Sequence, residues 1–279
     1  MRGFRDDVAV VTGAGSGIGR ALALDLARAR ARVEVSDIDA GAAERTASAC
    51  RDLGGWAKAS ALDVSDHRAV VEHAERVDHE HGRVDLVINN AGIALAANVV
   101  EQDVGDVLEV LDVNLRGVVH GTQAFLPALQ RAPAGRLVNL SSMFGLVPAP
   151  YNSAYAASKF AVRGYTEALA MDLDIVGSPV TVTCVHPGGV DTSIADNART
   201  APGNEDLVEG FKQLLRMPPE RASRIILRAV ARGQRRVLVG RDAWVMHVAN
   251  MVLGHRFQRL LAAGARRGAA DLRAPAATD

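Results

Sequence analysis

The chain is poor in cysteine and carries no excess charge of either sign. Its two cysteines, Cys50 and Cys184, lie far apart, so neither a disulfide framework nor a cysteine-based metal site is expected, although a single disulfide stays open as an alternative. A reducing cytoplasm is the simpler location for such a chain. Lysine plus arginine and aspartate plus glutamate each total 32, so no net electrostatic field favours nucleic acid.

Long hydrophobic runs are missing as well. No apolar run reaches the length of about 18 residues that a membrane-spanning helix needs, since residues such as His247 and Asn250 interrupt the longest ones. The N-terminal sequence MRGFRDD lacks the apolar core of a signal peptide. The apolar content of 48% and the charged content of 23% are ordinary for a globular protein.

Short β-branched runs alternate with longer helical patterns along the chain. This alternation predicts an α/β fold of the Rossmann type, with a doubly wound, seven-stranded and mainly parallel sheet covered by helices on both faces. Strands are predicted at 8–12, 32–36, 56–62, 85–89, 135–140, 180–185 and 236–239. Helices are predicted at 20–27, 40–53, 65–81 with Ser65 as N-cap, 101–131 with a break near Val113, 151–176 and 218–233.

The length of 279 residues suits one such domain with about 30 to 40 residues left over. We expect the dinucleotide-binding and catalytic domain to cover residues 1–242. Residues 243–279 would form a helical extension, frayed from Gly264 onward because that stretch is rich in alanine, arginine and glycine.

A glycine-rich turn, TGAGSGIG over residues 12–19, joins the first predicted strand to the first helix. Glycines allow a tight turn and a close approach of the backbone to a pyrophosphate, and the helix N-terminus offers free N–H groups. A purely structural turn is the alternative. The predicted phosphate-binding residues are Gly13, Ser16, Gly17, Ile18 and Gly19.

Asp37 ends the second predicted strand. A carboxylate there can accept hydrogen bonds from ribose hydroxyls and would repel a 2′-phosphate. The glycine turn has Ser16 and no basic residue, so both features favour NAD over NADP as the cofactor. Asp37 could instead be only a strand-ending turn residue, and Asp39 lies close by. Further expected cofactor contacts follow the third and fourth strands, at Asp63, Val64, Asn90, Ala91 and Gly92.

Tyr155 and Lys159 lie four residues apart in a predicted helix and therefore share one face. The positive charge of the lysine would lower the pKa of the phenol towards neutral pH. Beside a dinucleotide site, such a phenol suggests proton transfer coupled to hydride transfer. Tyr151 and Tyr165 have no lysine at the same spacing.

Together these motifs resemble those of the short-chain dehydrogenase/reductase family, single-domain type. The matching segments occur in the family's order between about Val8 and Val239: TGAGSGIG, Asp63, NNAG at 89–92, Asn114 in DVNLRG, Ser142 in NLSS, YAASK at 155–159 and PGGVDT at 187–192.

The resemblance implies a role for each residue. Tyr155 would exchange a proton with the substrate oxygen, Lys159 would hold the nicotinamide ribose, and Ser142 would hydrogen-bond the substrate oxygen. The family's spacing selects Ser142 over Ser141. Asn114 would bind a water that links Lys159 to solvent. The nicotinamide would be wrapped by Pro187, Gly188, Val190 and Thr192. The family also suggests a homodimer or homotetramer formed through helices in 99–131 and 151–176.

The expected function is an NAD-dependent oxidoreductase that interconverts a secondary alcohol and a ketone, with apolar bulk on the substrate. A non-catalytic NAD-binding regulator and a related epimerase or dehydratase are the alternatives. Substrate specificity is expected from a lid over residues 193–217 and from the apolar stretch 243–263. That stretch could cover the pocket, pack against another subunit or lie on a membrane surface without spanning it.

No metal site is expected. His67, His73, His79 and His81 share one predicted helix, but their spacing does not pair two ligands on one face, and a solvated face is favoured. His186 is expected to be a turn residue before the 187–192 segment.

Overall fold

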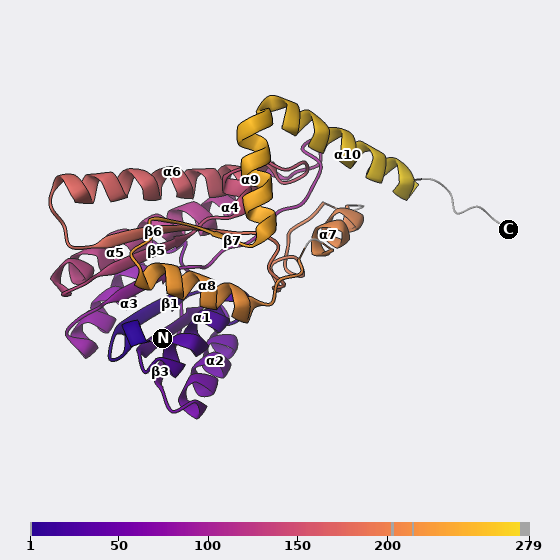
Figure 1. Ribbon diagram of the computed structural model, residues 1–279. Helices are drawn as coiled ribbons and strands as arrows, with labels where there is room; N and C mark the ends of the chain where they lie inside the picture. The colour runs from indigo at the N-terminus through magenta and orange to yellow at the C-terminus, as the bar shows by residue number, and fades with distance from the viewer. Residues whose placement is uncertain (1, 202–203, 214, 274–279) are drawn as a thin grey trace.

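Seven parallel strands form a single sheet in the order β3-β2-β1-β4-β5-β6-β7 (Figure 1). The computed structural model describes residues 2–201, 204–213 and 215–273. Each neighbouring pair of strands in this sheet is parallel, which confirms the predicted doubly wound fold. The strands are β1 (Val8–Thr12), β2 (Arg32–Asp37), β3 (Trp56–Ala61), β4 (Leu86–Asn89), β5 (Arg136–Leu140), β6 (Thr181–Pro187) and β7 (Arg236–Val239).

Helices cover both faces of the sheet, so the central strands β1 and β4 are buried on both sides and are almost entirely apolar. Along β1, Ala9 and Val11 pack into one core with α1, α2 and α8, whereas Val8 and Val10 pack into a second core with α3, α5 and α6. The helices are α1 (Gly17–Arg28), α2 (Ala40–Asp52), α3 (His67–His81), α4 (Val104–Leu111), α5 (Gly117–Arg131), α6 (Ser153–Ile175), α7 (Glu205–Lys212), α8 (Pro219–Ala231), α9 (Arg241–Leu253) and α10 (His255–Arg273).

The start of α3 differs from the prediction. Asp66, rather than Ser65, is the N-cap, and its carboxylate accepts hydrogen bonds from the backbone N–H groups of Arg68 (2.9 Å) and Ala69 (3.1 Å). The Ser65 hydroxyl cannot serve as the cap because it donates to Asp63, at 2.7 Å.

The break expected near Val113 is present. A five-residue π-helical turn, η2 (Asp112–Arg116), separates α4 from α5, and α4 begins at Val104 rather than at residue 101. Such turns are frequent at functional sites because the extra residue re-aims a side chain. Here the turn contains Asn114, which is fully buried.

The C-terminal extension consists of two helices. α9 follows β7 after Gly240, and α10 turns away from the body of the protein (Figure 1). Fraying is predicted from Gly264 onward, and the structure continues α10 to Arg273 through a segment rich in alanine and arginine, which favour helix. Residues 274–279 lie outside the described residues. The predicted lid, 193–217, contains α7.

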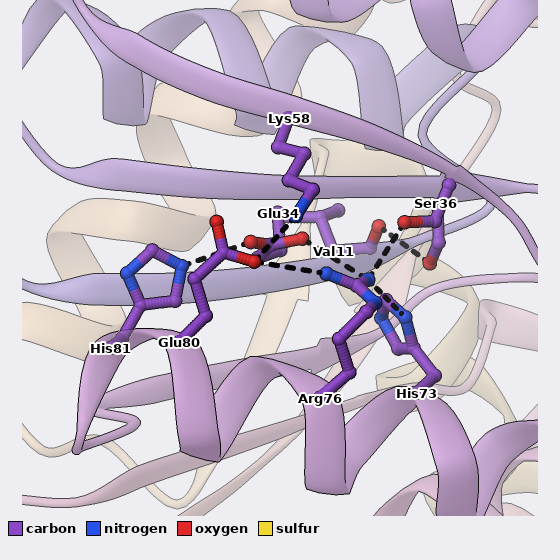
Figure 2. Close-up of polar contacts among 9 residues, drawn as sticks. Val11, Glu34, Ser36, Lys58, His73, Arg76, Glu80 and His81 are labelled. Carbon is purple, nitrogen blue, oxygen red and sulfur yellow. Dashed lines mark hydrogen bonds and ion pairs between the residues drawn. The ribbon is translucent and has the colours of Figure 1, made fainter.

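A buried charge network joins β2 to α3 (Figure 2). Glu34 on β2 is fully buried, and its carboxylate accepts a hydrogen bond from Nε2 of His81 at 2.9 Å and lies 3.5 Å from Nη2 of Arg76. Nη2 of Arg76 also donates to Nδ1 of His73 at 2.8 Å. His73 and His81 are therefore packed against the sheet, which corrects the expectation that they lie on a solvated helix face.

The same network contains a group of residues that could bind a metal ion. Glu34, Glu80 and His81 bring ligand atoms within 4.8 Å of one another. Lys58 donates to Glu80, however, and the guanidinium of Arg76 lies 3.5 Å from an oxygen of each carboxylate (Figure 2). Two cations already balance the two carboxylates, so a divalent ion would add uncompensated charge here.

His73 should make the stability of the protein depend on pH. Burial lowers its pKa from 6.5 to about 4, and the nearby Arg76 acts in the same direction. The unfolded chain therefore takes up a proton below pH 6.5 that the folded chain takes up only near pH 4, and the free energy of unfolding should fall by up to about 3 kcal/mol between these values.

Urea unfolding between pH 7.5 and pH 4 measures this loss. His73→Gln, which keeps an acceptor for Arg76 but cannot titrate, should remove the His73 part of the loss and leave the part due to His186, whose pKa burial also lowers to about 4, whereas His79→Gln on the exposed side of the same helix should leave the dependence unchanged. Equal pH dependence in wild type and His73→Gln would contradict the assignment.

Candidate active site

A cleft of about 330 Å³ opens at the carboxyl edge of the sheet. Ligands bind at this edge in doubly wound folds, next to the point where the strand order reverses, which here lies between β1 and β4. The cleft brings together every predicted site residue except Gly19 and Asn114. The predicted residues that line it are Gly13, Ser16, Gly17, Ile18, Asp37, Asp63, Val64, Asn90, Ala91, Gly92, Ser142, Tyr155, Lys159, Pro187, Gly188, Val190 and Thr192.

The glycine turn has the geometry of a phosphate cradle. Gly13 and Gly17 have φ values of +60° and +52°, which side chains disfavour, and a Cβ on Gly13 would lie 2.6 Å from Cα of Ala91. α1 begins at Gly17 without a side-chain cap, so the N–H groups of its first turn face the cleft for an anion. Gly19 serves the packing of α1 instead. A Cβ there would collide with the carbonyl of Gly13, so this glycine lets the helix lie against the turn.

Asp37 closes one end of the cleft. Its Oδ2 accepts a hydrogen bond from the N–H of Gly15 at 2.8 Å, and its Oδ1 accepts one from the N–H of Asp39 at 3.1 Å. Each carboxylate oxygen can accept a further bond, so Asp37 can order the turn and also receive ribose hydroxyls. Asp39 does not compete for this role, because its carboxylate caps α2 through Gly41 and Ala42.

Asn90, which follows β4, is hydrogen-bonded to the glycine turn. Its side-chain amide donates to the carbonyls of Thr12 and Gly13, at 2.9 Å each, and its backbone N–H donates to the Thr12 hydroxyl at 3.0 Å. The N–H of Ala91 donates to the same hydroxyl at 3.1 Å. The side chain of Asn90 is therefore used to shape the cleft wall.

The other end of the cleft contains Tyr155, Lys159 and Ser142. Tyr155 and Lys159 lie on α6 and are only 6% and 3% exposed. Nζ of Lys159 lies 5.6 Å from the centre of the tyrosine ring and donates to the carbonyl of Leu140 at 3.1 Å. The hydroxyl of Ser142 accepts from the N–H of Phe144 at 3.1 Å and is hydrogen-bonded to Tyr155.

Burial sets the protonation of this pair. It raises the pKa of Tyr155 to about 12, opposed by the hydrogen bond to Ser142, and it lowers the pKa of Lys159 to about 8. The expectation that Lys159 lowers the pKa of Tyr155 is therefore wrong for this arrangement, because desolvation of the phenolate outweighs an ammonium that is directed at a backbone carbonyl. Tyr155 is a protonated phenol at neutral pH.

Asn114 supports this end of the cleft from behind. Its amide donates to the carbonyl of Ile93 (2.9 Å) and the hydroxyl of Ser158 (3.0 Å), and it accepts from the N–H of Ile93 (2.8 Å). A Cβ on Gly92 would lie 3.1 Å from Oδ1 of Asn114 and 3.3 Å from Nζ of Lys159, so a side chain there would press on both groups. The side chain of Asn114 is thus occupied by protein partners.

Ser141 and His186 support the cleft through backbone carbonyls. The hydroxyl of Ser141 donates to the backbone carbonyl of Lys159 at 2.8 Å. His186 is fully buried within β6, where its Nδ1 donates to the carbonyl of Ser142 at 3.1 Å and burial lowers its pKa to about 4. It is a strand residue, which corrects the expectation of a turn.

One residue that sequence analysis did not identify holds the 187–190 loop. Asp242, in the first turn of α9, accepts a hydrogen bond from the N–H of Gly189 at 2.6 Å, and its carboxylate fills the space where a Cβ on Gly188 would lie. The N–H of Gly188 donates to Val239 at the end of β7, at 2.8 Å. No local pattern marks Asp242, because its partner lies 53 residues earlier in the chain.

Apolar side chains that were not among the predicted site residues also line the cleft, since they lie in segments without a motif. Met143, Phe144 and Ile194 pack with Tyr155. Ile38, Ile93 and Leu215 are the other large ones that were not predicted.

Comparisons with known proteins agree with this geometry. Residues 7–203 match the family model described as short chain dehydrogenase. The chain is 45% identical to SadH of Mycobacterium tuberculosis, a protein named as an oxidoreductase, over 95% of this chain and 97% of that protein.

Two solved structures are similar along most of the chain. A short chain dehydrogenase/reductase from Burkholderia phymatum, in complex with NAD, superposes with a TM-score of 0.85 at 30% identity and covers 93% of this chain and 96% of its own. Levodione reductase superposes with a TM-score of 0.76 at 25% identity and covers 87% of this chain and 98% of its own.

Asp242→Ala should loosen the 187–190 loop. The substitution removes the charged acceptor of the Gly189 N–H, and such a bond contributes about 1.5 to 3 kcal/mol. Hydrogen exchange at Gly189 should therefore become at least about tenfold faster. Asp242→Asn, which keeps a neutral acceptor, should give an intermediate rate. Unchanged protection in Asp242→Ala would contradict the role of this carboxylate.

Proposed function

The chain belongs to the short-chain dehydrogenase/reductase family, and we propose that it is an NAD-dependent oxidoreductase that interconverts a secondary alcohol and a ketone. One observation carries the proposal: Tyr155, Lys159 and Ser142 lie together at one end of a single cleft whose other end contains the glycine turn and Asp37. The uncapped N-terminus of α1 and the positive φ values of Gly13 and Gly17 fit a pyrophosphate.

Asp37 supports NAD over NADP. A 2′-phosphate beside this carboxylate would be repelled. It would also lack a counter-ion, because Lys159, at the far end, is the sole basic residue among the described residues that line the cleft. NAD, when bound, supplies the hydride acceptor for alcohol oxidation and, as NADH, the hydride donor for ketone reduction.

The protein's own residues would transfer the proton and stabilise the charge that develops on the substrate oxygen. In ketone reduction, Tyr155 donates its phenolic proton to the substrate oxygen, and the raised pKa of the phenol keeps this proton in place at neutral pH. Ser142 holds the same oxygen by a hydrogen bond as negative charge develops. In alcohol oxidation the transfer is reversed, and the proton moves from the substrate hydroxyl to the Tyr155 oxygen.

The apolar wall near Tyr155 supports a substrate with apolar bulk. Met143 and Phe144 pack with Tyr155 and Ala243, and Ile194 packs against the same cluster. Such a wall would desolvate a hydrocarbon group but would leave the hydroxyls of a sugar without partners. A substrate panel in which small polar sugars alone are turned over would contradict this part of the proposal.

A homodimer or homotetramer through α4, α5 and α6 is also part of the proposal. Large apolar side chains on α4 and α6 are exposed in the single chain: Val104 at 69%, Leu108 at 54%, Phe160 at 38% and Met171 at 58%. Association would remove them from water. We place the protein in the cytoplasm, where its two buried cysteines would stay reduced.

Tyr155→Phe tests the enzyme against a non-catalytic NAD-binding regulator. The substitution removes the proton donor and keeps the ring, so kcat with NADH and apolar ketones should fall by about 10² to 10⁴ while NADH binding is retained. Tyr165→Phe is the matched control, because Tyr165 lies on the same helix outside the cleft. Full activity in Tyr155→Phe, or no turnover of any alcohol or ketone by the wild type, would contradict the proposal.

A further inference from the structure

α9 has apolar side chains on its outer side as well as on the side that packs against the protein. Its inner side packs through Ala243, which is fully buried with Met143, Phe144 and Tyr155. A helix of this composition is normally buried on all sides. The outer α9 face, defined by four exposed side chains, consists of Trp244 (60% exposed), Val245 (57%), Met251 (71%) and Val252 (77%).

The next helix, α10, is basic. Its Leu260 is 61% exposed, and Arg256, Arg259 and Arg266 are exposed on the same helix. α9 and α10 together contain six arginines and two aspartates, although the whole chain has no net charge. One of these aspartates, Asp242, is hydrogen-bonded to Gly189. The extension thus combines an apolar face that includes a tryptophan with a local excess of positive charge.

Charge decides which partner suits this surface. A second copy that docked through the same two helices would add its own excess of arginines to the contact, and like charges repel. An anionic lipid surface supplies the opposite charge, and its headgroup boundary accommodates apolar and tryptophan side chains. None of the described helices is long and apolar enough to cross a bilayer. A helix that lies on the surface therefore suits these residues better than one that inserts through it.

We propose that α9 and α10 form a docking surface for an anionic lipid bilayer. Trp244, Val245, Met251 and Val252 would enter the headgroup boundary, and the arginines of α10 would contact lipid phosphates.

The position of this surface also suggests where the substrate comes from. Ala243 is buried in the same cluster as Tyr155, and the next residue, Trp244, belongs to the outer α9 face. A docked protein would therefore hold the substrate end of its cleft close to the lipid. This step rests on the proposed function: the substrate class it names is a lipophilic alcohol or ketone that partitions into the bilayer.

The two tryptophans of the chain, Trp56 and Trp244, allow a direct test. Trp56→Phe leaves Trp244, which lies on the docking surface, as the only tryptophan of the chain. With vesicles of phosphatidylglycerol and phosphatidylcholine at low salt, its emission should shift to the blue and be quenched by brominated lipid chains. Vesicles of phosphatidylcholine alone should give little change, and high salt should reverse binding. No shift and no quenching with the anionic vesicles would overturn the proposal.

Surface variants then separate the two contributions in a vesicle sedimentation assay. Arg256→Glu with Arg259→Glu should lower the partition coefficient by at least about tenfold. Met251→Ser with Val252→Ser should lower it as well, because apolar insertion is lost. Ile175→Ser with Val176→Ser is the matched control: these residues are 82% and 70% exposed at the end of α6 and should not affect binding.

Light scattering identifies the rival partner. If the Met251 and Val252 substitutions reduce the oligomer mass and leave vesicle binding unchanged, a second copy of the chain covers this face and the proposal is wrong. NADH binding and turnover of a water-soluble alcohol are measured separately and should be retained in every variant. Failure of lipid docking is therefore distinguishable from failure of the proposed enzyme activity.

Discussion

Because all seven strands run in one direction, the segments that follow them meet at one edge of the sheet. The glycine turn after β1, Asp37 at the end of β2, Asn90 after β4, Ser142 after β5 and the 187–190 loop after β6 all reach the cleft in this way. The sheet can have this form only because helices bury both of its faces, which requires the nearly continuous apolar strands that the chain contains. The site is thus a consequence of strand direction and burial.

Burial also determines the chemistry of the site. Tyr155 and Lys159 are removed from water, which disfavours their charged forms, so the pKa of the phenol rises and that of the ammonium falls. The polar groups behind them are satisfied by the protein itself, as the contacts of Asn114 with Ile93 and Ser158 show. An ordered environment from which water is excluded keeps a proton donor in a fixed position.

Sequence patterns were sufficient for features with a local cause. Period and turn signals located β1 and β7 to the residue and the break near Val113, since strand ends and turns depend on neighbouring residues. The resemblance to a family added cleft residues such as Ser142 and the 187–192 segment. Sequence patterns failed for features that depend on contacts between residues far apart in the sequence. The burial of His73 and His81 depends on Glu34 of β2, and the role of Asp242 depends on Gly189. The pKa of Tyr155 depends on desolvation, which sequence spacing does not report.

The central claim is that the cleft binds NAD, with Asp37 at its adenosine end. The most direct test is a fluorescence titration of the purified wild-type protein with NADH and with NADPH under identical conditions. We expect NADH to bind much more tightly, because Asp37 would accept ribose hydroxyls and none of the described residues at that end of the cleft is a basic counter-ion for a 2′-phosphate. Tighter binding of NADPH, or binding of neither nucleotide, would contradict it.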